Sequence, residues 1–468
     1  MNPLKKPLPA YILIITAAMI LIAVACNKNS SSTGTTTNSN PNNIPAEQIV
    51  TASVQGRVVD ENGLPVEGAA VTSGTAAATT DVNGVFSFSA ISMSSRFGYV
   101  QAIKSGYVTG SKSIITNGGA NSYINIQLIP QNRTGFFPAL TGGFADAEVT
   151  DTVTFGDSSV VTASPNALYT GEAYVYATYL DPTDSLSYPK MPGDLRGIGT
   201  NGYETALQSF GLVDIQMMDP SGNALQVASG KTARMVWVIP ASLQSTAPAT
   251  VPLWYFNDTT GRWIQQGTAL RSGNTYVGQV SHFTWWTCAQ AVSTVNFNVT
   301  FKDQFGNPLA YAFYIIQSTT MGTQGGYTNS SGFAQGLIPK SASLTIKIVS
   351  QCGTLLGGVN VGPALSDQTL GTITVTTIGG VLTLTGTVVD CNNNPVDSGY
   401  VSTIIDGLNY KATVKNGVYT LAVNRCFSQP ITVSLTPVDL TTQLQGSPLS
   451  LQQVVDGKDS VGQLTACQ

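Results

Sequence analysis

The chain has only one histidine, His282, in 468 residues, and only 10% of its residues are charged. Globular proteins carry about 25% charged residues. One histidine excludes the HExxH zinc motif and the usual sites that mix histidine with cysteine. The phosphate-binding motif GxxxxGK[ST] and the nucleophile motif GxSxG are also missing. We therefore expect no cofactor, no metal and no enzyme activity, although carboxylate pairs of the glycosidase kind follow no spacing rule and stay open.

The charge balance also lacks a basic excess. A net charge of −4 provides no basic surface for nucleic acid, so we expect no nucleic-acid partner. In place of charge, the chain is rich in Ser, Thr, Asn, Gly, aromatic and β-branched residues. β-branched and aromatic side chains favour strands, whereas Thr, Asn and Gly are poor helix formers. The composition predicts an all-β fold.

The N-terminus carries a separate signal. Lys5 and Lys6 precede fifteen apolar residues, YILIITAAMILIAVA, and Cys26 follows directly. The run is short for a membrane span, which needs about 20 residues, and it suits a signal peptide. With Ala23 and Ala25 before the cysteine, the junction resembles the lipobox of bacterial lipoproteins. An uncleaved signal anchor is the alternative.

The lipobox resemblance implies cleavage after residue 25 and a lipid on Cys26, so the expected partner is a membrane, contacted through the lipid anchor. Asn27 and Lys28 follow the cysteine, and neither is the aspartate that retains lipoproteins at the inner membrane. We therefore expect the outer membrane, with the protein facing the surface or the periplasm. Residues 26–49 are polar and lack apolar periodicity, which predicts a disordered tether.

One pattern occurs three times in the chain. Each copy has a strand, a turn with an aspartate, a proline five residues later and a second strand. The three pairs are Asp60 with Pro65, Asp303 with Pro308, and Asp390 with Pro395. Alternation of apolar and polar residues, as in VNFNVTFK, is typical of a strand with one buried face. Local turn chemistry explains these aspartates, and Asp81, better than calcium binding does, because the dense spacing of a calcium loop is missing.

These repeats resemble the carboxypeptidase regulatory-like domain, a small transthyretin-like or immunoglobulin-like antiparallel β-sandwich. The resemblance implies a non-enzymatic domain. It divides the chain into a leader at 1–25, the tether at 26–49, and sandwiches at 50–131, 132–291, 292–377 and 378–468. The stretches MPGDLRGIGTNG and VSHFTWW in the middle segment are distantly similar to the ankyrin and netrin-receptor sandwich family.

All five tryptophans lie in the second half of that middle segment. Exposed, coplanar rings would stack on sugars, so Trp254, Trp263, Trp285 and Trp286 are candidate binding residues. This alternative function is a carbohydrate-binding accessory protein. Burial of all five is the default for large aromatic side chains and would dismiss the idea.

The tripeptide His282–Phe283–Thr284 is similar to the His-Phe-Ser junction at which some relatives of this family cut themselves. In a strand, His282 and Thr284 share one face. His282 would then act as the base and Thr284 as the nucleophile for cleavage after Phe283. The structural alternative places Phe283 in the core and His282 on a solvated or partner-facing side, and we favour it.

Five cysteines remain after Cys26, and export permits disulfides. Cys391, Cys426 and Cys467 lie in the last repeat, so we expect a bridge among them without knowing which two it joins. Our main expectation is a non-catalytic surface lipoprotein with a structural, adhesive or display role, whose partner is a glycan or a surface protein.

Overall fold

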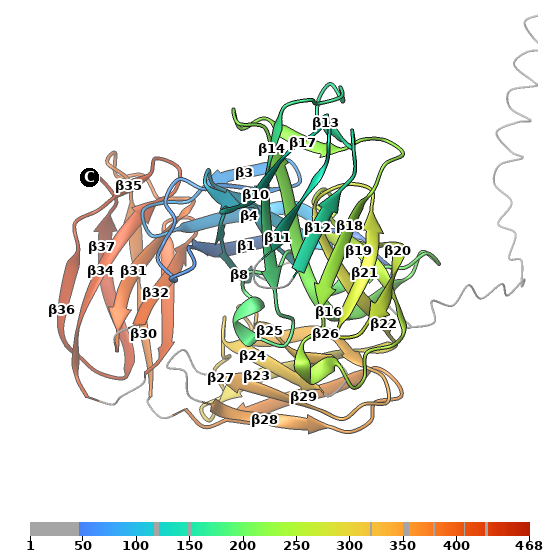
Figure 1. Cartoon of the computed structure of the whole chain (residues 1–468). Helices are drawn as coiled ribbons and strands as arrows, with labels where there is room; N and C mark the ends of the chain where they lie inside the picture. The colour runs from blue at the N-terminus through green and yellow to red at the C-terminus, as the bar shows by residue number, and fades with distance from the viewer. Residues whose placement is uncertain are drawn as a thin grey trace, which may run out of the picture. The chain divides into compact units, whose positions relative to one another are not determined.

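The computed structural model shows an almost entirely β protein (Figure 1). It describes residues 46–116, 121–147, 151–318, 321–349, 355–377, 380–406, 408–425 and 429–468. Within these ranges, helix is confined to two three-residue 3-10 turns, Ser185–Ser187 and Ala241–Leu243. The predicted all-β class is therefore confirmed. The leader, Cys26 and the tether up to residue 45 lie outside the described residues.

The first sandwich has a three-stranded and a four-stranded sheet, with strand orders β4-β1-β8 and β3-β2-β5-β7. Its strands are β1 (Ile49–Val59), β2 (Ala70–Ser73), β3 (Ala76–Thr79), β4 (Val85–Ser94), β5 (Gly98–Ile103), β7 (Gly110–Ile114) and β8 (Asn121–Gln127). Every second residue of β1 from Ala52 to Val58 is buried, as the period of a strand with one core face requires. Two short strands, β6 (Tyr107–Val108) and β9 (Ile129–Pro130), pair separately.

The third and fourth sandwiches repeat this arrangement. Their three-stranded sheets have the orders β26-β23-β29 and β33-β30-β37, and the larger sheets are β25-β24-β27-β28 and β32-β31-β34-β35. The third comprises β23 (Thr294–Asp303), β24 (Phe313–Ser318), β25 (Gly322–Tyr327), β26 (Phe333–Pro339), β27 (Leu344–Val349), β28 (Leu355–Val361) and β29 (Gln368–Val375). The fourth comprises β30 (Val381–Val389), β31 (Gly399–Ile405), β32 (Leu408–Val414), β33 (Val418–Asn424), β34 (Ile431–Asp439), β35 (Leu444–Gln445), β36 (Leu449–Val454) and β37 (Gly457–Thr465).

The three repeats share one departure from a purely antiparallel sandwich. The last strand of each lies parallel to the first, in the pairs β1–β8, β23–β29 and β30–β37. Parallel neighbours need a long crossover connection, and the rest of the sandwich supplies it. Each repeat thus brings its two ends together and buries a core of its own.

The predicted turn chemistry is visible in all three repeats. The carboxylate of Asp60 accepts the backbone N–H groups two and four residues further on, and Asp303 and Asp390 do the same. Gly63 and Gly306 have the positive φ expected at these turns, and Asn393 takes the corresponding place in the last repeat. Asp81 accepts two N–H groups in the same way at the second turn of the first sandwich. These aspartates therefore shape turns.

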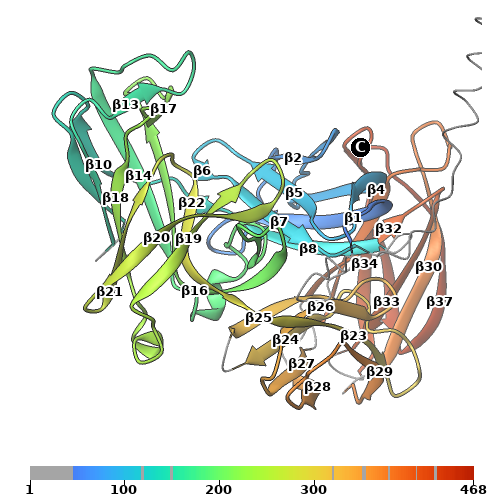
Figure 2. The ribbon, with the colours of Figure 1, turned by 90° about the vertical axis from the view of Figure 1, so that its right-hand side faces the viewer.

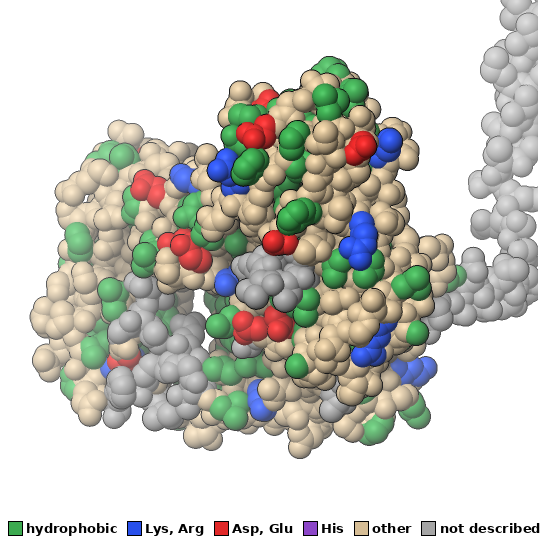
Figure 3. Space-filling view, in the orientation of Figure 1, with side chains coloured by type: hydrophobic (Ala, Val, Ile, Leu, Met, Phe, Trp, Pro, Cys, Tyr) green, Lys and Arg blue, Asp and Glu red, His purple; other side chains and the backbone are tan. Residues whose placement is uncertain are grey.

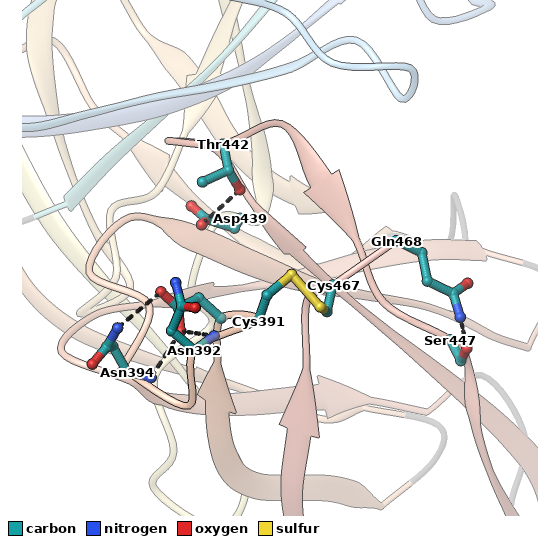
Figure 4. Close-up of a disulfide and its surroundings, with 9 residues drawn as sticks. Cys391, Asn392, Asn394, Asp439, Thr442, Ser447, Cys467 and Gln468 are labelled. Carbon is teal, nitrogen blue, oxygen red and sulfur yellow. Dashed lines mark hydrogen bonds between the residues drawn. A yellow bond between two sulfur atoms is a disulfide. The ribbon is translucent and has the colours of Figure 1, made fainter.

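A contact between the turn and the end of the last strand also recurs, with different chemistry each time. In the first sandwich the Gln127 side chain donates to the backbone carbonyl of Glu61, at 3.1 Å. In the third, Thr377 donates its backbone N–H and its hydroxyl to Gln304 Oε1, at 2.9 and 3.1 Å. In the fourth, Cys391 and Cys467 form a disulfide (Figure 4). We call this contact the end clasp.

The middle sandwich is one hydrogen-bonded network of 13 strands (Figure 2). Its strands are β10 (Arg133–Pro138), β11 (Gly143–Ala147), β12 (Asp151–Phe155), β13 (Val160–Thr162), β14 (Glu172–Leu180), β15 (Arg196–Ile198), β16 (Glu204–Met218), β17 (Ala224–Val227), β18 (Ala233–Val238), β19 (Thr250–Asn257), β20 (Arg262–Ser272), β21 (Thr275–Val280) and β22 (Trp285–Val292). Strand β16 pairs with β14, β15, β17 and β22, and its register with β22 shifts between Ser209 and Leu212. Such a register shift is typical of a β-bulge, at which a strand bends and its twist increases.

Candidate functional site

A cavity of about 160 Å³ is lined by strands β7 and β8, the segment 188–196 and strands β24 to β26. Four tyrosines line it: Tyr123, Tyr188, Tyr314 and Tyr327. We call it the tyrosine-lined cavity. The segment that contributes Tyr188 follows a 3-10 turn, which begins where the Asp184 carboxylate accepts the N–H of Leu186.

The tyrosine rings pack against each other and the core. The rings of Tyr123 and Tyr327 meet edge to face, with centroids 5.1 Å apart, and Tyr314 packs in the same manner on Phe297. Burial raises the pKa of Tyr314 to about 12 and that of Tyr123 still further. At neutral pH these phenols are therefore uncharged, and they give the cavity aromatic walls with polar edges.

Lys112 closes one side of the cavity. Its ammonium donates to the backbone carbonyls of Tyr188 and Met191, at 2.8 and 2.7 Å, and lies 5.1 Å from the centre of the Tyr188 ring. Burial lowers the pKa of Lys112 to about 7, and the nearby carboxylate of Asp194 offsets part of this effect. Lys112 thus fastens strand β7 to the segment that carries Tyr188.

Beside the cavity lies a buried group of four charges, which we call the ion cluster: Arg96, Asp194, Arg196 and Glu204. Arg196 contacts Asp194 at 2.7 Å and Glu204 at 3.1 Å. Arg96 binds the same Glu204 carboxylate with two nitrogens, at 2.8 and 3.1 Å. Two positive and two negative groups balance, and a buried charge requires such pairing. Burial raises the pKa of Asp194, which Arg196 partly offsets.

The tryptophans do not form the predicted platform. All five are at most 3% exposed, so Trp254, Trp263, Trp285 and Trp286 offer no ring face to a ligand at the surface. Three indole N–H groups donate to backbone carbonyls inside the protein: Trp254 to Ala289, Trp263 to Asp194 and Trp286 to His282. Sugar stacking requires exposed rings, and these rings are packed in the core. The tryptophans therefore do not form a sugar-binding surface.

His282 and Thr284 lie between β21 and β22, outside any strand, so the shared strand face expected for them is not formed. The His282 ring packs against Tyr255 and Trp286, and burial lowers its pKa. The Thr284 hydroxyl instead donates to the Phe256 carbonyl at 3.1 Å, with the Asp258 carboxylate at 3.4 Å.

We expect the chain to stay uncut after Phe283. The Phe283 side chain is buried, and its backbone N–H and carbonyl are both bound by the Gln226 side chain. The Thr284 hydroxyl is hydrogen-bonded to Phe256 and Asp258, and no hydrogen bond to His282 is formed among the described residues. Intact-mass spectrometry of the purified chain checks this, with one unbroken species expected. Two fragments that meet at Thr284, and that disappear in Thr284→Ala, would establish self-cleavage.

A bridge was expected among the three cysteines of the last repeat. The structure joins Cys391 to Cys467, and Cys426 lies outside the described residues. Cys288 is fully buried in the middle sandwich.

Sequence reasoning missed the tyrosine-lined cavity and the ion cluster. The signal closest to them was the stretch MPGDLRG, which places two opposite charges, Asp194 and Arg196, two residues apart. On the face seen in Figure 3, basic side chains are scattered among acidic ones. Within the described residues, the structure has no helix with the length and apolarity needed to cross a membrane.

Comparisons with known proteins give short or distant similarities. No family model matches the chain. Human cartilage intermediate layer protein 2 is 30% identical over 109 residues, which is 23% of this chain and 9% of that protein. Most of the human protein therefore has no counterpart in this alignment, and its biology does not transfer to this chain.

Solved structures with a similar arrangement include the TIE protein of Bacillus anthracis, with 9% identity, a TM-score of 0.17 and coverage of 90% of this chain and 50% of that one. A streptococcal ancillary pilin has 12% identity and a TM-score of 0.18, with 48% and 95% covered. The shaft pilin SpaA of Lactobacillus rhamnosus GG has 10% identity and a TM-score of 0.20, with 37% and 97% covered. At these TM-scores the similarities say nothing about function.

Proposed function

We propose that this chain is a non-catalytic surface protein, anchored by lipid at Cys26, which displays a row of β-sandwiches for a structural or adhesive role. The observation that carries the proposal is the repetition of one self-contained sandwich, with its own core and its two ends together. β-sandwiches of this kind are common in cell-surface proteins, and their loops are free to vary on a rigid frame.

The disulfide supports an exported location. Disulfides persist in oxidising compartments and are rare in the cytosol, and the structure joins Cys391 to Cys467. Together with the lipobox-like junction at Cys26, this bridge favours a lipoprotein outside the cytoplasm.

The proposal predicts that Cys26→Ala abolishes lipid labelling and releases the chain from the membrane, because a diacylated cysteine is the expected anchor. Cells that produce the wild-type chain or the variant are fed a radiolabelled fatty acid, and intact cells are stained with an antibody against the fourth sandwich. Ser30→Ala, a change within the tether, serves as the matched control and keeps both signals.

Two results would contradict the proposal. The first is label that persists in Cys26→Ala. The second is antibody staining that needs permeabilised cells. For the adhesive role, cells that display the wild-type chain are compared with Cys26→Ala cells on glycan-coated and protein-coated surfaces. Equal retention on every surface would leave only the structural role.

A further inference from the structure

Four polar atoms of residues that line the tyrosine-lined cavity have no hydrogen-bond partner among the described residues. They are Asn125 Oδ1, Asp194 Oδ1, Arg196 Nη2 and Gln324 Nε2, and all four are inaccessible to solvent. Arg196 as a whole is only 6% exposed. Buried polar atoms nearly always have partners, because an unfilled donor or acceptor is costly away from water. Four such atoms around one cavity indicate that a polar occupant supplies the missing hydrogen-bond partners.

The unfilled atoms define what the occupant offers. Arg196 Nη2 and Gln324 Nε2 are donors. Asn125 Oδ1 and Asp194 Oδ1 are acceptors. Hydroxyl groups satisfy both kinds, since each donates one hydrogen bond and accepts others. The tyrosine rings add flat apolar walls on which the C–H face of a ring can pack.

The charges argue for a neutral occupant. Arg196 is already paired with Asp194 and Glu204, and Arg96 balances the remaining charge of the ion cluster. Lys112 is held by two backbone carbonyls. A charged ligand would therefore enter a site whose charges are already paired, and would lose its own hydration without a free counter-charge.

We propose that the tyrosine-lined cavity binds one ring of a neutral sugar. Its volume of about 160 Å³ limits the ligand to a single ring; a protein cavity of about 150 Å³ is known to hold one benzene molecule. The ring is either a free monosaccharide or the end unit of a longer glycan. The site differs from the buried tryptophans in every residue, and it does not depend on the lipid at Cys26.

The test is calorimetric titration of the full chain, kept in detergent, with glucose, galactose, mannose and N-acetylglucosamine and with oligosaccharides that end in them. We expect at least one sugar to bind. Gln324→Leu removes one unfilled donor and should weaken binding about three- to tenfold, the range for a single neutral hydrogen bond. Binding of monosaccharides alone indicates a free-sugar site, and binding of the oligosaccharides too indicates the end of a glycan.

Gln317→Leu is the matched control, because Gln317 lies on strand β24 with its side chain exposed and outside the cavity lining. It should leave affinity unchanged. Tyr314→Leu, which removes an aromatic wall, provides a second variant that should also bind more weakly. The five tryptophans lie in the middle sandwich and do not report on the third, so an unchanged far-UV circular dichroism spectrum and an unchanged calorimetric unfolding profile show that each variant is folded.

The proposal fails if none of these sugars binds at concentrations of about 10 mM, which would leave water as the occupant. It also fails if Gln324→Leu and Tyr314→Leu bind like the wild type, which would place the sugar elsewhere. Either failure is distinguishable from failure of the surface role, since a chain that is lipidated and displayed yet binds no sugar refutes only the cavity.

Discussion

Glu204→Gln is expected to lower the free energy of unfolding of the middle sandwich by about 3–5 kcal/mol. The substitution keeps the size of the side chain and removes its charge. Arg96 and Arg196 both bind the Glu204 carboxylate, and both are 6% exposed. Without that charge the ion cluster has two guanidinium groups against the single carboxylate of Asp194, and an uncompensated positive charge stays buried.

Urea unfolding followed by tryptophan fluorescence measures this change, because all five tryptophans lie in the middle sandwich and are buried. Glu47→Gln is the control. Its carboxylate also pairs with an arginine, Arg262, at 2.9 Å, but the Glu47 side chain is 37% exposed. We expect a loss of at most about 1 kcal/mol there, and one that shrinks in high salt. Equal losses for the two variants would contradict the role assigned to burial.

The repeats were predictable because their signals are local. A carboxylate at Asp60, Asp303 or Asp390 accepts N–H groups only two and four residues away, so the sequence of the turn is sufficient to specify it. Alternating burial along β1 is likewise a property of one segment. The parallel pairing of the first and last strands joins segments far apart in the sequence. The residues of either strand alone do not predict it.

The tyrosine-lined cavity illustrates the opposite case. Lys112 sits in GSKSI, which reads as a strand with a solvated lysine, and its burial comes from Tyr188 and Met191, more than 70 residues further along the chain. The tryptophans were recognised as candidates, but their exposure depended on packing between strands distant in sequence. The sequence therefore indicated an aromatic binding site. The tertiary structure buries the tryptophans and forms a cavity lined by tyrosines instead.

The end clasp offers a comparison within one chain, because the same junction is closed by hydrogen bonds in the third sandwich and by a disulfide in the fourth. The position after the turn aspartate is Gln304 in one and Cys391 in the other. The partners, Thr377 and Cys467, each lie two residues after the last strand. The bridge closes a segment with a sequence separation of 76.

Replacing both cysteines, Cys391→Ala with Cys467→Ala, is expected to destabilise the fourth sandwich by about 4–5 kcal/mol, since the unfolded chain regains the entropy of a long open loop. For a unit of this size that corresponds to a fall in Tm of roughly 15 °C or more. Differential scanning calorimetry measures it, and a reducing agent should lower the wild-type transition while leaving that of the double variant unchanged.

Gln304→Ala breaks the equivalent clasp of the third sandwich and should cost only about 1–2 kcal/mol, because Gln304 Oε1 receives two hydrogen bonds that water replaces on unfolding. The difference between the two losses of unfolding free energy then measures what the covalent bond adds beyond a hydrogen-bonded contact at the same place. If the double cysteine variant loses no more stability than Gln304→Ala, the bridge adds nothing beyond that contact. If Gln304→Ala itself costs clearly more than about 2 kcal/mol, the contact between the turn and the last strand limits the stability of the third sandwich.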